Sequence, residues 1–293
     1  MSNVSVKTAK FESDHQRENL DEFVYLHIPD ILNQAQYDEL FGYQLSSQGE
    51  YFNKDVFDAL IFKYLKANDF QVQESKDQLL NTLIWRKNFN PLSAAFNETH
   101  DSKFDDIGVL TNYGNNEANT KIITWNLYGA GGNPKELFKD LEKFLRYRIG
   151  LMERSVQLLD FTNEENCFMT QVHDYKGVSF LRIDPDIKKG SKATIQIFQD
   201  YYPELLYKKF FVNIPSVLFW VFEFMKKLLP TETTKKFIIL NHSTGIYKYL
   251  GDEVPSKNYG GKGKDLELQN VKEIKPPVYG AHLSQQLFTN EVD

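Results

Sequence analysis

The sequence TQVHDYKGVS, residues 170–179, decides the fold and carries the first candidate site of this chain. Residues 166–175 are short, mixed in polarity and bounded by turn-forming residues, which predicts a β-strand. Because strand side chains alternate between faces, His173 and Tyr175 share one face and Asp174 lies on the other. An imidazole beside a phenol can ligate a metal, shuttle a proton or simply form a hydrogen-bonded pair at a strand end. The stretch alone leaves these alternatives open.

The composition is that of an ordinary globular protein with an excess of aromatic residues. Hydrophobic residues make up 41% and charged residues 25% of the 293 residues, whereas aromatic residues reach 14%. Such a content is typical of an aromatic core or of a pocket lined by flat side chains. The net charge of −6 argues against a nucleic-acid partner, since phosphate contacts need a basic surface.

Cysteine use and hydropathy predict a cytoplasmic protein that associates with membranes, such as the endoplasmic reticulum, only peripherally. Cys167 is the only cysteine, so an intrachain disulfide is excluded and a reducing compartment is expected. Residues 1–20 are polar and lack the apolar core of a signal peptide, which predicts a mobile N-terminal tail. Residues 210–225 are the most apolar, but polar residues interrupt them and they are too short to cross a bilayer.

The pattern of apolar residues divides the remaining chain into three parts. An all-helical N-terminal module is expected over 21–98, an α/β domain over 99–266 and an irregular C-terminal tail over 267–293. The helices expected in the module are 22–46, 56–65 and 71–89. The domain is expected to alternate strands at 107–111, 121–128, 166–175, 210–213 and 236–240 with helices at 134–159, 184–201, 216–228 and 244–250. This alternation predicts a sheet with substantial parallel pairing.

Motifs for common enzyme sites are absent from the sequence. The glycines at 129–132 match neither a dinucleotide nor a P-loop spacing, and no G-x-S-x-G elbow occurs. The six histidines are scattered, which disfavours a zinc site. We therefore expect no enzymatic activity.

Four motifs in a fixed order are similar to those of a known family. They are DYKGVS at 174–179, YYPE at 201–204, NIP at 213–215 and YGG at 259–261. Together they resemble the signature of the CRAL-TRIO lipid-binding proteins, over residues 37–263. The resemblance implies a mixed, largely parallel sheet flanked by helices, preceded by a helical module, with a deep hydrophobic pocket closed by a helical gate. The apolar residues 216–228 fall at the gate.

Further segments resemble one fungal branch, the non-classical phosphatidylinositol transfer proteins that bind haem. These segments are 85–93, 124–129, 146–153 and 169–179. The branch implies a ferric haem b with Tyr175 as the axial ligand, where other members of the family carry an aliphatic residue. A phenolate is a hard anionic ligand that suits ferric iron.

The same branch implies roles for the neighbours of Tyr175. His173 would hydrogen-bond the phenolate or bind the iron weakly. Arg148 and Lys209 would pair with the haem propionates, and Tyr128 would contact the ligand from the adjacent strand. The implied function is haem binding linked to oxidant stress or haem homeostasis. A haem enzyme acting on peroxides is a weaker alternative, because no distal acid–base set is recognisable.

The alternative function implied by the family is phosphatidylinositol binding and transfer, with a transient membrane partner. Glu204 and Lys236 match positions that phosphatidylinositol-binding members use near the headgroup. The family's basic pair after the first long helix is replaced here by Asn68 and Asp69. This replacement predicts a headgroup region that has lost two positive charges.

Overall fold

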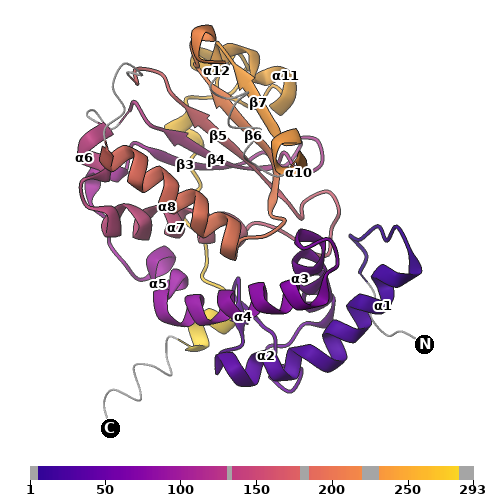
Figure 1. Ribbon diagram of the computed structural model, residues 1–293. Coiled ribbons are helices and arrows are strands. Elements are labelled where there is room, and N and C mark those ends of the chain that lie inside the picture. The colour runs from indigo at the N-terminus through magenta and orange to yellow at the C-terminus, as the bar shows by residue number, and fades with distance from the viewer. Residues whose placement is uncertain (1–5, 131–133, 179–184, 220–230, 284–293) are drawn as a thin grey trace.

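The computed structural model describes residues 6–130, 134–178, 185–219 and 231–283, and the fold below is that of these residues. An N-terminal group of helices precedes a central sheet that carries helices on its faces (Figure 1). The helices of the N-terminal group are α1 (Asp14–Glu22), α2 (Ile28–Ala35), α3 (Lys54–Ala67), α4 (Val72–Phe89) and α5 (Pro91–Phe96). The mixed α/β class predicted from the alternation of elements is confirmed.

The start of the chain differs from the sequence prediction. Helix α1 begins within the expected tail, capped by Ser13, whose hydroxyl accepts a hydrogen bond from the Gln16 amide. A π-helical segment (Phe23–His27) joins α1 to α2. The predicted helix over 22–46 ends early, because Gln36 adopts a left-handed conformation with φ of 50°. The chain then forms a hairpin of β1 (Glu39–Leu40) and β2 (Tyr43–Gln44).

The central sheet has the strand order β3-β4-β5-β6-β7. Strands β3 and β4 are antiparallel, and the remaining neighbours are parallel. The strands are β3 (Gly108–Asn112), β4 (Ile122–Leu127), β5 (Met169–Asp174), β6 (Leu206–Val212) and β7 (Phe237–Leu240). The five predicted strands are confirmed, although β6 begins four residues before its predicted start.

The helices that connect the strands largely follow the prediction. The expected helix 134–159 is divided into α6 (Pro134–Phe138) and α7 (Leu141–Val156), since Asp140 caps a new helix by accepting from the Lys143 amide. Helix α8 (Pro185–Tyr201) lies beside α7 over one face of the sheet (Figure 1). Only a short 3-10 turn, Ser216–Leu218, is described at the start of the predicted gate helix, and residues 220–230 lie outside the described residues.

The two faces of the sheet have different chemistry. One face is apolar, and its core is built from Trp125, Val172 and Phe210 with residues of the C-terminal segments. The helices and turns that contribute are α11 (Tyr247–Leu250), α12 (Ser256–Tyr259) and the 3-10 turn Leu266–Gln269. Helix α10 (Thr231–Lys235) precedes β7, and the 3-10 turn Ser243–Gly245 precedes α11. The other face, toward α7 and α8, carries polar side chains such as Gln171 and His173. A polar side chain on a buried sheet face needs a partner there.

Buried ion pairs join the N-terminal helices to the sheet domain. The Arg86 guanidinium donates to the carboxylates of Glu39 and Glu153 at 2.7–3.1 Å, and all three side chains are 0% exposed. The expected C-terminal tail also returns to the fold through residue 283. The Val271 amide donates to the Leu110 carbonyl at 2.7 Å, extending the contacts of β3.

Candidate functional site

Two groups of polar and charged residues lie at different places on the sheet. The first, here called the interior cluster, consists of Tyr128, Arg148, His173, Tyr175 and Lys209. His173 is on β5, Tyr128 and Tyr175 directly follow β4 and β5, Lys209 is on β6 and Arg148 is on α7. All five were predicted from the sequence, and the structure brings them together on the sheet face toward α7 and α8.

The strand register explains how the sheet residues of the interior cluster converge. Gln171 on β5 is paired with Lys209 on β6, and His173 is paired with Phe211. Because side chains two residues apart on a strand share a face, Lys209 lies on the same face as His173, two residues nearer the start of the strands. The His173 and Phe211 rings stack with centroids 5.5 Å apart. The cation and the imidazole therefore share one buried surface.

His173 is held by neutral polar groups. Its Nδ1 is 2.9 Å from the Tyr128 hydroxyl, and its Nε2 is 3.4 Å from Gln171 Oε1. Burial lowers the pKa of His173 well below its ordinary value, and the nearby Lys209 and Arg148 lower it further. His173 is thus neutral at physiological pH and pairs with Tyr128 rather than carrying charge.

Tyr175 completes the aromatic part of the cluster. Its ring centroid is 5.2 Å from that of Tyr128. Burial raises the pKa of the Tyr175 phenol, and the neighbouring Tyr128 raises it further. The protein alone therefore keeps Tyr175 as a phenol, and only a bound cation would favour the phenolate.

Arg148 is the least satisfied polar side chain of the interior cluster. It is 2% exposed, and its three guanidinium nitrogens have no hydrogen-bond partner within the described part of the chain. Its guanidinium lies 4.9 Å from the ring centroid of Phe198 on α8. Burial lowers the pKa of Lys209 to about 7, with Arg148 contributing. A buried cation without acceptors is unfavourable, so Arg148, with the partly buried Lys209 beside it, indicates an anionic ligand.

The second group, here called the lysine cluster, consists of Lys63, Lys66, Glu204 and Lys236. The Glu204 carboxylate is 3.7 Å from Lys66 Nζ and 3.5 Å from Lys236 Nζ. The buried Lys63 ammonium donates to the carbonyls of Glu204 and Cys167, at 2.8 and 3.0 Å. Burial lowers its pKa to about 8, so Lys63 remains mostly charged at neutral pH. Two cations beside the Glu204 carboxylate and a third on its backbone carbonyl leave an excess of positive charge at the edge where β6 and β7 begin.

The lysine cluster supplies positive charge close to the positions where the family's basic pair is replaced. Asn68 and Asp69 do replace a basic pair, and the Asn68 amide donates to the Tyr64 carbonyl instead. Lys63 and Lys66, from the preceding helix, supply the charge. Sequence reasoning missed both, although their spacing of three residues places them on one helix face.

The described residues contain neither a metal-ligand cluster nor a membrane-spanning helix. No group of three or more His, Cys, Asp or Glu side chains among them could hold a metal ion. None of the helices described is both long and apolar enough to span a bilayer.

Comparison with known proteins places these features in context. The CRAL/TRIO domain model matches residues 118–261, and the CRAL/TRIO N-terminal domain model matches residues 24–81. Among curated proteins, phosphatidylinositol transfer protein SFH5 of Candida glabrata is 44% identical over 97% of this chain and 100% of its own length. The protein of the same name from Saccharomyces cerevisiae is also 44% identical, again over 97% of this chain and 100% of its own length. The crystal structure of Sfh5 superposes with a TM-score of 0.91 and 44% identity, covering 96% of this chain and 100% of that one.

Proposed function

The chain belongs to the CRAL/TRIO family, and from this premise we propose that it binds phosphatidylinositol and transfers it between membranes. The relatives named as phosphatidylinositol transfer proteins, which match 97% of this chain, support the proposal. The proposed activity is binding and exchange rather than catalysis, with transient contact at a membrane surface.

The observation that carries the proposal is the lysine cluster. The excess positive charge of Lys63, Lys66 and Lys236 suits the phosphodiester of an anionic headgroup, and the Glu204 carboxylate can accept hydrogen bonds from inositol hydroxyls. Phe211 and Ile239 lie farther along β6 and β7, on the sheet face of the interior cluster. This arrangement suits a phospholipid whose acyl chains contact the apolar sheet face and whose headgroup stays at the lysine cluster.

The direct test is to measure transfer of labelled phosphatidylinositol from donor to acceptor vesicles. Mass spectrometry of lipid extracted from the purified protein should identify phosphatidylinositol. Transfer no faster than spontaneous exchange, together with an extract free of phosphatidylinositol, would contradict the proposal.

We propose as a second function that the interior cluster holds haem b. The observation that favours it is a pair of cations, the buried Arg148 with its unsatisfied donors and the partly buried Lys209 with its lowered pKa, which fit two carboxylates such as the propionates. Tyr175 would be the axial ligand, and the neutral His173 would orient Tyr128 beside it. Haem bound there would supply a ferric centre, which would favour the Tyr175 phenolate.

The absorption spectrum of the purified protein tests this second function. A haem-loaded protein should show a Soret band, and Tyr175→Phe should lose most of it while keeping the fold. The matched control is Tyr207→Phe, which also replaces a tyrosine on this sheet by phenylalanine but removes a hydroxyl outside the cluster. An unchanged haem content and spectrum in Tyr175→Phe would refute the assignment of the ligand.

A further inference from the structure

A cavity of about 490 Å³ lies at the opposite edge of the sheet from the lysine cluster. Its walls come from the residues that follow the parallel strands β5, β6 and β7 and from α12. In open α/β sheets, ligands bind preferentially in crevices at the carboxyl ends of parallel strands. The polar residues that line it are Tyr175, Lys176, Asn213, His242, Ser243, Thr244, Lys257 and Asn258.

The charge of the cavity lining is one-sided. Lys176 and Lys257 line it, and no carboxylate is among the lining residues of the described chain. The nearest buried acid is Asp174, whose oxygens already accept from the Lys176 amide, Asn213 Nδ2 and the Tyr259 hydroxyl, at 2.6–2.8 Å. The two lysines therefore give the cavity a positive lining.

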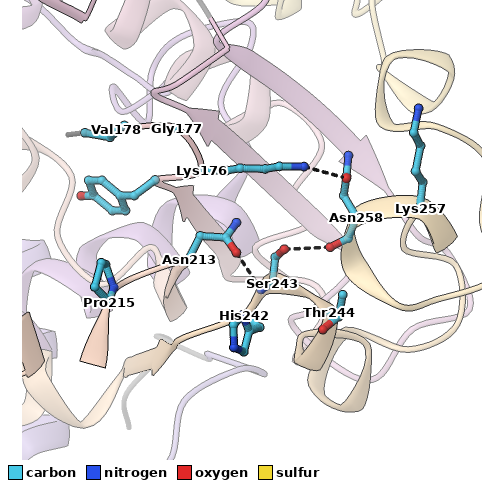
Figure 2. Close-up of a pocket in the computed structure, with 11 residues that line it drawn as sticks. Lys176, Gly177, Val178, Asn213, Pro215, His242, Ser243, Thr244, Lys257 and Asn258 are labelled. Atoms are coloured by element: carbon cyan, nitrogen blue, oxygen red, sulfur yellow. Dashed lines mark hydrogen bonds between the residues drawn. The ribbon is translucent and has the colours of Figure 1, made fainter. Parts of the chain in front are cut away.

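A hydrogen-bonded frame fixes the polar wall of the cavity (Figure 2). The Ser243 amide donates to Asn213 Oδ1 at 3.1 Å, and the Ser243 hydroxyl donates to the Asn258 carbonyl at 2.7 Å. Lys176 Nζ donates to Asn258 Oδ1 at 3.1 Å. Residues 176, 213, 243 and 258, from four separate segments of the chain, are thereby joined, so the wall is organised before any ligand binds.

Several hydrogen-bond donors of the cavity wall remain available to a ligand. Within the described residues, Thr244 Oγ1, Lys257 Nζ and Asn258 Nδ2 have no hydrogen-bond acceptor. Lys176 uses one of its three ammonium protons on Asn258. Ammonium, hydroxyl and amide donors around one crevice match the several acceptor oxygens of a phosphate group.

We propose that this cavity is a second anion site, which binds the phosphate group of a small phosphorylated ligand. It is separate from the lysine cluster, because β6 spans seven residues between the two edges, roughly 20 Å. Its volume is that of a small-ligand pocket rather than of a bound ion alone. Tyr175 lines the cavity and also belongs to the interior cluster, so the second site adjoins the interior site.

The test uses the full chain and three probes: inorganic phosphate, inositol 1-phosphate, and phosphatidylcholine vesicles containing phosphatidic acid. Calorimetry measures the first two, and vesicle sedimentation measures the third. The variant Lys176→Ala/Lys257→Ala should weaken binding by about tenfold or more, since it removes two charged donors. The matched control Lys248→Ala/Lys264→Ala removes the same charge from exposed lysines outside the cavity, and should keep wild-type affinity.

The probes separate the possible sources of the phosphate. Loss of binding of the soluble probes supports a soluble phosphorylated ligand, and loss restricted to the vesicles supports a lipid headgroup; either result supports the site. Loss of binding in the cavity variant but not in Lys248→Ala/Lys264→Ala assigns the bound probe to this cavity, because the cavity variant leaves the lysine cluster intact. Equal binding by wild type and the cavity variant, or no binding of any probe, would overturn the proposal.

Discussion

Replacing Lys236 by alanine tests the headgroup role of the lysine cluster most directly. Lys236 Nζ lies 3.5 Å from Glu204 Oε1, and its side chain is 23% exposed. A unit charge 4 Å from a phosphate is worth about 4 kcal/mol at an effective dielectric constant near 20. Solvent exposure and the loss of side-chain entropy reduce this to about 1–2 kcal/mol for a partly exposed pair. The variant should therefore bind phosphatidylinositol about 5–30-fold more weakly.

The assay is transfer of labelled phosphatidylinositol between vesicles, measured over a range of protein concentrations. Lys208→Ala is the matched control, because Lys208 lies on β6 next to the cluster but its side chain is on the opposite face of the sheet from Lys209. The reasoning would be refuted if Lys236→Ala transferred phosphatidylinositol within twofold of wild type. It would also be refuted if Lys208→Ala lost as much activity.

The remaining predictions concern the interior cluster and the buried ion pairs. Because the pKa of Lys209 is about 7, Lys209 loses its charge as pH rises through 7. Haemin affinity should then fall by up to about tenfold per pH unit above 7, and a flat pH profile in a haemin titration would contradict this. Arg148→Met should stabilise the ligand-free protein by about 1–3 kcal/mol in urea unfolding, because it removes unsatisfied buried donors, while haemin binding is lost. A destabilised Arg148→Met would mean that the guanidinium is satisfied without ligand. Arg86→Leu leaves Glu39 and Glu153 buried without a cation, and should lower the free energy of unfolding by about 3–5 kcal/mol. A loss below about 1 kcal/mol in urea unfolding would show that the three side chains rearrange.

Some residues of the candidate site were predicted before the structure was known, whereas the contacts of others were not. The roles proposed for Arg148 and Lys209 came from family resemblance, because most basic residues are solvated and nothing in their local sequence directs them inward. Lys63 and Glu204 are 141 residues apart in sequence, and their contact was not predicted. The loss of two charges inferred from Asn68 and Asp69 stays a prediction, but positions along one helix could not show that Lys63, Lys66 and Lys236 gather nearby in space.

The sequence by itself determined how side chains alternate along the strand that contains His173, and with it the shared face of His173 and Tyr175. That result is local, since the side-chain period of a strand follows from backbone geometry alone. The sequence also determined the class of fold, because strands that alternate with helices favour parallel pairing. Only the tertiary structure decided which distant cations meet these residues. Helix α7 carries Arg148 over one sheet face, and the ends of β5, β6 and β7 bring Lys176, Asn213 and His242 around the cavity proposed to bind a phosphate group. Such convergence depends on strand order and register, which are set by packing across the whole domain.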